Sequence, residues 1–261
     1  MAEIDYSSYL SVDELLNLQH PLSDGPEHDE LLFIIIHQSY ELWFKSVLHE
    51  LAAVQSALES GDLHRALALV GRVRTIMKAL VSQVDILETM TPLQFNSFRD
   101  RLASSSGFQS GQFRVLEAVL GRRDRSMLNH FTVGSPMWER IDAALTRPSL
   151  WDSTLVLMAG RGHSIPVDVL TRDVSAPYES TTEVQDAVES AYRRDAELGL
   201  LLERLVDLDE GLQEWRYRHV KMVERTIGMK MGTGGSMGAA YLVTTLFNPV
   251  FPDLWAVRSR F

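Results

Sequence analysis

The chain has 261 residues, of which 45% are hydrophobic, and it carries a formal net charge of −10 and no cysteine. The hydrophobic fraction is enough for a sizeable core and excludes an intrinsically disordered chain. The acidic balance argues against a general nucleic-acid binder, since a phosphate-binding surface needs clustered Lys and Arg. The absence of cysteine excludes disulfides and every metal centre that depends on a thiolate ligand.

Two further features indicate a cytoplasmic protein. The longest uninterrupted apolar run, Leu31 to Ile36, has six residues, whereas a membrane-spanning helix needs about 20. The start, Met1 to Asp5, is acidic and polar, unlike a secretory signal peptide. We therefore expect a soluble protein that stays in the cytoplasm, which the lack of cysteine also fits.

Apolar residues recur at helical spacing through most of the chain. The pattern predicts helices over residues 29–59 and 63–90, a helix that opens at Thr91-Pro92, a helix over 109–120, shorter helices within 123–148, and two more over 182–207 and 210–228. Residues 159–181 show little periodicity, and no stretch alternates for long enough to predict a strand. We therefore predict one all-α domain over residues 1–261, built on long core helices.

The first long helix contains an apolar run and a histidine. Leu31 to Ile36 is apolar on nearly every side, so it must be buried on several sides, in the core or at a subunit interface. Phe33 and His37, four residues apart, share one face. Two interpretations remain open: an aromatic pocket wall with a nitrogen beside it, or a core histidine bonded to a backbone carbonyl.

The helix that opens at Thr91 places Phe95, Arg99 and Leu102 on one face. Burying an arginine between apolar residues is costly without an anion. Arg99 is therefore either a fork for a ligand carboxylate or the partner of a nearby acid such as Asp100 or Glu88.

His219 is the candidate metal ligand. Trp215 and Met222 lie on adjoining faces of its helix, so its ring is predicted to point toward an apolar interior. No second histidine stands at chelating spacing, so a metal here would have one protein ligand, as haem iron can; a core histidine is the alternative. Four cations of the same helix form either a site for anionic cofactor groups or a solvated face: Arg216, Arg218, Lys221 and Arg225.

Residues 232–238 form a glycine-rich segment that carries Thr233. The segment lacks the Lys-Ser/Thr of a phosphate loop and the glycine spacing of a dinucleotide site. We interpret it as a mobile lid with a hydroxyl; a merely flexible loop is the alternative.

Several blocks in the same order closely resemble the tryptophan 2,3-dioxygenase family. They are Phe33 to Trp43, Leu87 to Pro92, Phe98 to Asp100, Ser105 to Ser110 and the segments around His219 and Thr233. The resemblance extends from Tyr6 to Trp255 and is weak only between about 120 and 210. It implies an all-helical protein with a haem pocket, usually a homotetramer assembled as a dimer of dimers.

The resemblance also implies an activity and its cofactor. Members use haem b, one per subunit, and insert O2 across the indole C2–C3 bond of L-tryptophan. The product is N-formylkynurenine, in tryptophan catabolism along the kynurenine pathway. The expected partners are therefore L-tryptophan or an analogue, O2 and other copies of the chain.

Matching positions imply roles for single residues. His219 is expected to be the axial iron ligand, and His37 the catalytic residue that meets the indole N–H. Phe33 is expected to pack on the indole, Arg99 to bind the carboxylate and Thr233 to contact the amino-acid end. The other positions expected at the substrate are Tyr6, which in the family reaches a neighbouring subunit, Ile34, Ile35, Ile36, Phe95, Leu102 and Ser106.

The chain departs from the family pattern at two places. Met229-Lys230-Met231 stand where members commonly have Phe-Lys-Arg, and Val84 stands where an aromatic residue is frequent. Smaller side chains there leave open a haem-dependent monooxygenase of secondary metabolism, acting on a substituted tryptophan to give an oxindole-type product. A haem-binding or amino-acid-binding protein without turnover and a purely structural helical oligomer are further alternatives.

Overall fold

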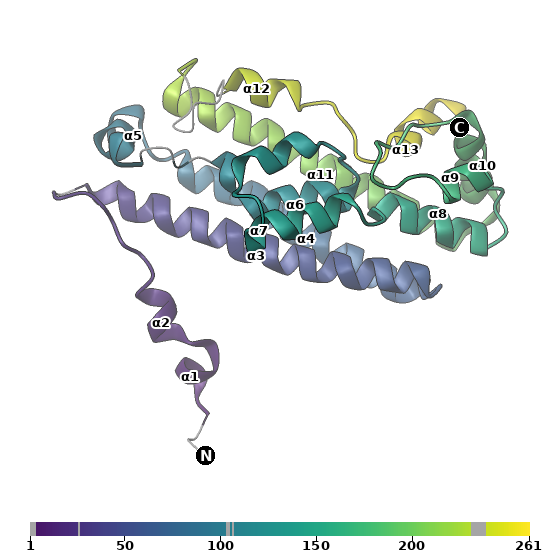
Figure 1. The fold of residues 1–261 in the computed structure, drawn as a ribbon, viewed down its shortest axis with the longest axis horizontal. Coiled ribbons are helices and arrows are strands. Elements are labelled where there is room, and N and C mark those ends of the chain that lie inside the picture. The colour runs from purple at the N-terminus through teal and green to yellow at the C-terminus, as the bar shows by residue number, and fades with distance from the viewer. Residues whose placement is uncertain (1–3, 26, 103–104, 106, 231–238) are drawn as a thin grey trace.

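The computed structural model describes residues 4–25, 27–102, 105, 107–230 and 239–261, without the side chains of residues 108 and 241. Every regular element of this part of the chain is a helix (Figure 1). The α-helices are α1 (Tyr6–Leu10), α2 (Val12–Leu16), α3 (His28–Glu59), α4 (Leu63–Leu87), α5 (Pro92–Arg99), α6 (Gly111–Leu120), α7 (Pro136–Leu145), α8 (Leu150–Gly160), α9 (Val167–Leu170), α10 (Thr182–Arg194), α11 (Ala196–Ile227), α12 (Ala239–Thr244) and α13 (Pro252–Ala256). The 3-10 helices are η1 (Asp100–Leu102), η2 (Gly107–Gln109), η3 (Arg125–His130) and η4 (Val257–Arg260). The predicted all-α class is confirmed for the described residues.

The long helices α3, α4 and α11 form the scaffold, and α4 packs against both of the others (Figure 1). Each buries a stripe of apolar side chains at helical spacing, such as Val47 on α3, Val70 and Leu80 on α4, and Leu205 on α11. Full burial of one such side chain stabilises the fold by about 1.5–3 kcal/mol. The apolar side chains whose spacing predicted the first two long helices are therefore the ones that pack these helices together.

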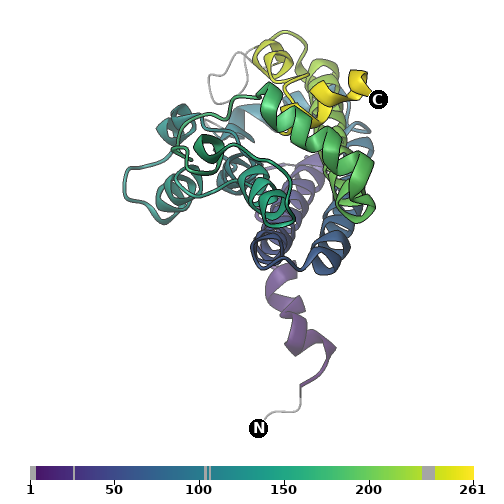
Figure 2. The same cartoon turned by 90° about the vertical axis from the view of Figure 1, so that its right-hand side faces the viewer.

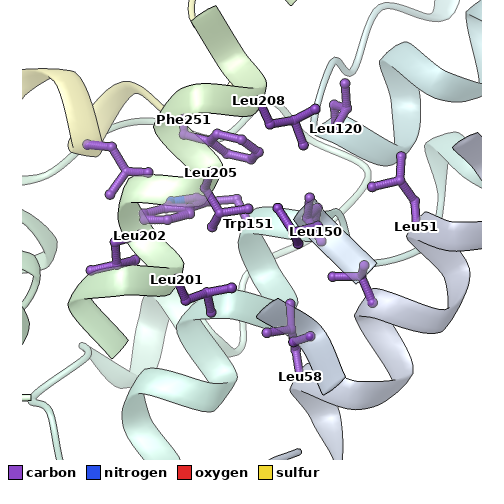
Figure 3. Close-up of a cluster of buried hydrophobic side chains, with 14 of the residues drawn as sticks. Leu51, Leu58, Leu120, Leu150, Trp151, Leu201, Leu202, Leu205, Leu208 and Phe251 are labelled. Carbon is purple, nitrogen blue, oxygen red and sulfur yellow. The ribbon is translucent and has the colours of Figure 1, made fainter. Parts of the chain in front are cut away.

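A cluster of buried hydrophobic side chains lies where α3, α6, α8 and α11 meet (Figure 3). Trp151 of α8 and Phe251, both fully buried, lie 5.8 Å apart by ring centroid. Leucines surround the two rings, among them Leu51 from α3, Leu120 from α6 and Leu205 from α11. This cluster fixes α6 and α11 relative to α3.

A buried carboxylate on α11 holds the segment that leads into α13. Asp209 has no exposed surface. It accepts hydrogen bonds from the backbone N–H of Val250 and of Phe251 (2.9 and 3.1 Å) and from Trp255 Nε1 (2.9 Å). Because a buried charge needs such partners, this end of the chain is tied to the scaffold.

Most helix starts follow from local sequence. As predicted, α5 opens at Thr91-Pro92, with Thr91 as its cap and Pro92 as its first residue, and Gln94 completes a capping box with Thr91. The predicted break between 207 and 210 is wrong: α11 is continuous there, and the chain breaks at Asp195. The Asp195 side chain accepts from the N–H of Leu198 (3.0 Å) and caps α11.

Other predicted boundaries differ by a few residues. The helix predicted over 63–90 ends at Leu87, and the one predicted over 109–120 begins at Gly111, capped by Ser110. The segment predicted to be irregular, 159–181, contains the short helix α9. Helix ends depend on single caps rather than on periodicity, so a pattern locates them less well.

The apolar run of α3 is only partly buried within one chain. Ile36 is 5% exposed, but Leu31 and Ile35 are 44% and 42% exposed. Burial of the whole run inside the chain is therefore wrong, and its burial at a subunit interface stays a prediction. Residues 4–25, with α1 and α2, project away from the helical body (Figure 2). No helix in the described part of the chain is long and apolar enough to cross a membrane.

Candidate active site

A cavity of about 520 Å³ lies between α3, α4, α5, α6 and α11. This volume is in the range of about 300–1,000 Å³ that is typical of small-molecule and cofactor sites. Its walls are largely apolar, including Val84 and Leu87 from α4 and Met222 from α11. A few polar side chains, described below, interrupt these walls.

Aromatic contacts show how the cavity follows α3. Phe33 lies against Phe95 and Phe98 of α5, with ring centroids 5.8 and 5.6 Å apart. Phe44, three turns further along α3, lies against Trp215 of α11 at 6.2 Å. We call the part near Phe33 the α5 end and the part near Phe44 the α6 end.

His37 is a neutral hydrogen-bond acceptor on the cavity wall. Its Nδ1 lies 2.7 Å from the carbonyl oxygen of Phe33. A carbonyl can only accept, so Nδ1 carries the proton and Nε2 is left as an acceptor. Burial lowers the pKa of His37 below its usual value. The ring is therefore neutral at pH 7, with one nitrogen able to accept an N–H.

His219 of α11 lines the same cavity. Burial, followed by the nearby His37 and Arg114, lowers its pKa to about 4. Its ring is therefore neutral, which is the form that binds a metal. The described residues contain no cluster of three or more His, Cys, Asp or Glu that could hold a metal, so His219 could act only as a single protein ligand.

Arg99 occupies the α5 end. It is half-buried in the last turn of α5 and lines the cavity with Phe95 and Leu102. Glu88, one of the two acids that the sequence offered as its partner, accepts hydrogen bonds from Arg218 and Arg225 (3.2 and 2.9 Å).

The α6 end holds a charged cluster that the sequence did not reveal. The Glu117 carboxylate is 2% exposed. It accepts from Arg114, from Arg122 (3.0 Å) and from Arg216 (3.2 Å), and all four residues line the cavity. The sequence contained a signal for this cluster. Arg114 and Glu117 share the apolar face of α6, where a buried charge needs a partner of opposite charge.

Only one of the four cations on the helix of His219 lies in this cluster, namely Arg216. Arg218 bonds to Asp85 and Glu88, and Lys221 bonds to Glu224 (2.8 Å). The basic face expected there is therefore mostly made of surface ion pairs.

The structure brings most of the predicted site residues together. Phe33, His37, Phe95, Arg99, Leu102 and His219 all line one cavity. Ile34, Ile35 and Ile36 are not among its lining residues, and Tyr6 on α1 is 77% exposed. Ser106 and Thr233 lie outside the described residues.

The cavity is largely apolar, it contains one imidazole able to bind a metal, and guanidinium groups line both of its ends. These are the features of a helical protein that holds a haem-like cofactor. The comparisons agree. The family model described as tryptophan 2,3-dioxygenase matches residues 1–133 and 193–261. The unmatched middle falls within the region where the resemblance was weak.

Curated relatives match nearly the whole chain. The tryptophan 2,3-dioxygenase of Anaeromyxobacter sp. (strain K) is 58% identical over 259 residues, which is 99% of this chain and 96% of the relative. That of Herpetosiphon aurantiacus is 55% identical over 256 residues, 98% of each chain. That of Caulobacter vibrioides is 46% identical, covering 99% of this chain and 98% of the relative. The chain belongs to the tryptophan 2,3-dioxygenase family and is an oxygenase enzyme.

Proposed function

We propose that this protein, one helical domain over residues 1–261, is a haem-dependent dioxygenase that converts L-tryptophan and O2 into N-formylkynurenine. The observation that carries the proposal is the meeting of neutral His37, neutral His219 and Arg99 in one cavity. Membership of the family supports the same reaction.

The cavity fits haem b by the chemistry of its walls. His219 would supply the axial nitrogen, and the guanidiniums of Arg114, Arg122 and Arg216 would pair with the two propionates. When bound, the haem supplies ferrous iron, which binds and activates O2. The apolar walls exclude water from the reacting groups.

The substrate would lie between the cofactor and the α5 end. Arg99 would bind its carboxylate with a bidentate fork, and the rings of Phe33 and Phe95 would pack on the indole. The Nε2 of His37 would accept the indole N–H and so fix the ring. These contacts act by positioning, which can supply about 7–11 kcal/mol of a barrier.

Five further residues belong to the proposal on the strength of the family resemblance. Thr233 and Ser106 would contact the substrate from their segments. Ile34, Ile35 and Ile36 would support the wall that Phe33 and His37 form. Neither the cavity nor the relatives favour monooxygenation.

Labelled oxygen tests the reaction. The reduced, haem-loaded protein should convert L-tryptophan under 18O2 into N-formylkynurenine that carries two labelled atoms. A product with one labelled atom would establish the monooxygenase instead. Full haem loading without product would overturn both. His219→Ala should abolish haem retention, while exposed His64→Ala serves as the matched control.

We also propose a homotetramer, a dimer of dimers, in the cytoplasm. Leu31, Ile35 and Leu42 leave an apolar strip exposed on one face of α3, at 44%, 42% and 53%. The projecting segment carries exposed Tyr6, which would reach a neighbouring subunit's site. Light scattering should give four times 29.5 kDa, and a monomer at micromolar concentration would contradict this assembly. Leu42→Lys should shift it toward smaller species.

A further inference from the structure

The imidazole of His219 lies on an indole ring. Trp215, one turn earlier on α11, has its ring plane 4° from that of His219, with centroids 5.3 Å apart. Offset stacking at this separation is a favourable arrangement of two flat rings. The stack therefore favours one plane for the imidazole.

No hydrogen bond from the described part of the chain restrains the His219 ring. Metal-bound histidines usually donate their second ring N–H to a carboxylate, a carbonyl or water, which fixes the ring orientation. No hydrogen bond joins either nitrogen of His219 to a described residue, whereas His37 has one to a backbone carbonyl. The stack with Trp215 therefore restrains the orientation of the His219 ring, as a hydrogen bond does for other metal-binding histidines.

The indole is itself immobilised from other helices. Phe113 of α6 lies 4.9 Å from it, and Tyr40 and Phe44 of α3 lie edge-on at 6.3 and 6.2 Å. The Tyr40 hydroxyl donates to the carbonyl of Leu80 on α4 (2.9 Å). The plane of Trp215 is therefore set by α3, α4 and α6 together.

We propose that Trp215 is a positioning residue that fixes the plane of the His219 imidazole and so the orientation of the axial ligand. The inference rests on the proposed ligation of haem by His219. An imidazole free to rotate about its bond to iron would adopt several orientations over the porphyrin. A single orientation gives every iron centre the same ligand field and slows ligand loss.

Two substitutions at Trp215 separate stacking from bulk. Trp215→Phe keeps a flat ring, and Trp215→Leu keeps an apolar side chain without a face. Phe44→Leu is the matched control, since it removes one edge-on contact of Trp215 but leaves the stacked pair itself and the contacts of Tyr40 and Phe113 in place. Resonance Raman spectra of the ferrous haem proteins report the iron–histidine stretch, and transfer of haem to apomyoglobin reports ligand loss.

We expect one narrow iron–histidine band in the wild type, Trp215→Phe and Phe44→Leu, and a broadened or split band in Trp215→Leu. Haem transfer from Trp215→Leu should be at least about tenfold faster than from Phe44→Leu. If Trp215→Leu cannot hold haem while Phe44→Leu of equal melting temperature can, the proposal is also supported. A wild-type band and transfer rate in Trp215→Leu, or equal haem loss in both leucine variants, would overturn it.

A separate control tests whether His219 binds the haem iron. A wild type with no iron–histidine band, or a band that persists in His219→Ala, would reject the proposed ligation itself. A wild-type band that depends on His219 but is indifferent to Trp215 would reject only the positioning role.

Discussion

Replacing Glu117 with glutamine removes the carboxylate that three arginines share at the α6 end of the cavity. Glutamine keeps the shape but takes away the charge bonded to Arg216, which is 7% exposed. Breaking a buried ion pair by removing one partner costs about 3–5 kcal/mol, a large part of a typical stability of about 5–15 kcal/mol. We therefore expect the melting temperature of the haem-free protein to fall by roughly 6–20 °C.

Urea unfolding of the haem-free and haem-loaded proteins measures this loss. Asp124→Asn is the matched control, because it removes a surface carboxylate, 38% exposed, from the same Arg122, and should cost at most about 1 kcal/mol. If the propionates meet the cluster, they replace part of the missing charge, so Glu117→Gln should lose less stability with haem than without it. A loss as small as that of the control would refute the reasoning about Glu117, and an equal loss with and without haem would refute the propionate contact.

Three further expectations follow from single contacts. Arg99→Gln should lower kcat/KM for L-tryptophan by about 2–5 kcal/mol of transition-state binding in steady-state assays, whereas Arg101→Gln, at a surface pair with Asp24, should leave it nearly unchanged. Burial holds the pKa of His219 at about 4 in the folded protein, below about 6.5 when unfolded, so the unfolded chain binds the extra proton between these values. The haem-free protein should thus lose stability as the pH falls from about 6.5 to about 4, by at most on the order of 3 kcal/mol, and His219→Gln should flatten this slope in urea unfolding at pH 7 and pH 5. Asp209→Asn should cost about 1.5–3 kcal/mol in the same unfolding assay, because its buried Oδ2 accepts two backbone N–H groups and an indole N–H.

Periodicity predicted most of the helical scaffold because the same stripes that define the pattern make the contacts. Val70 and Leu80 recur at helical spacing, and both are fully buried against neighbouring helices. The break at Asp195 was missed because it depends on one side chain that caps α11 at Leu198. The spacing of apolar residues continues across such a cap, so spacing alone could not locate the break between the two helices.

Taken residue by residue, His37, Arg99 and His219 each had two interpretations, and only the family resemblance placed them in one site. The packing of α3, α5 and α11 brings them to one cavity. The cluster at Glu117 joins α6 to Arg216 over 99 positions of sequence, and the flat contact of Trp215 on His219 depends on rings from other helices. Long-range contacts of this kind leave no periodic signal in the sequence.

The placement of charge at the two ends of the cavity explains how it would bind two anionic molecules in different places. Guanidiniums line both the α5 end, at Arg99, and the α6 end, around Glu117, while the two histidines between them are neutral because burial lowers the pKa of both. In the proposed arrangement, a cofactor bonded to His219 would have its carboxylates drawn to Arg216, three residues away on the same helix, at the α6 end. Arg99 would meet the carboxylate of the amino acid, and the indole would lie between the two ends, against the nitrogen of His37 that can accept its N–H. A charged histidine in the middle would attract either carboxylate and remove this order, which is why the neutrality of His37 and His219 matters as much as their position.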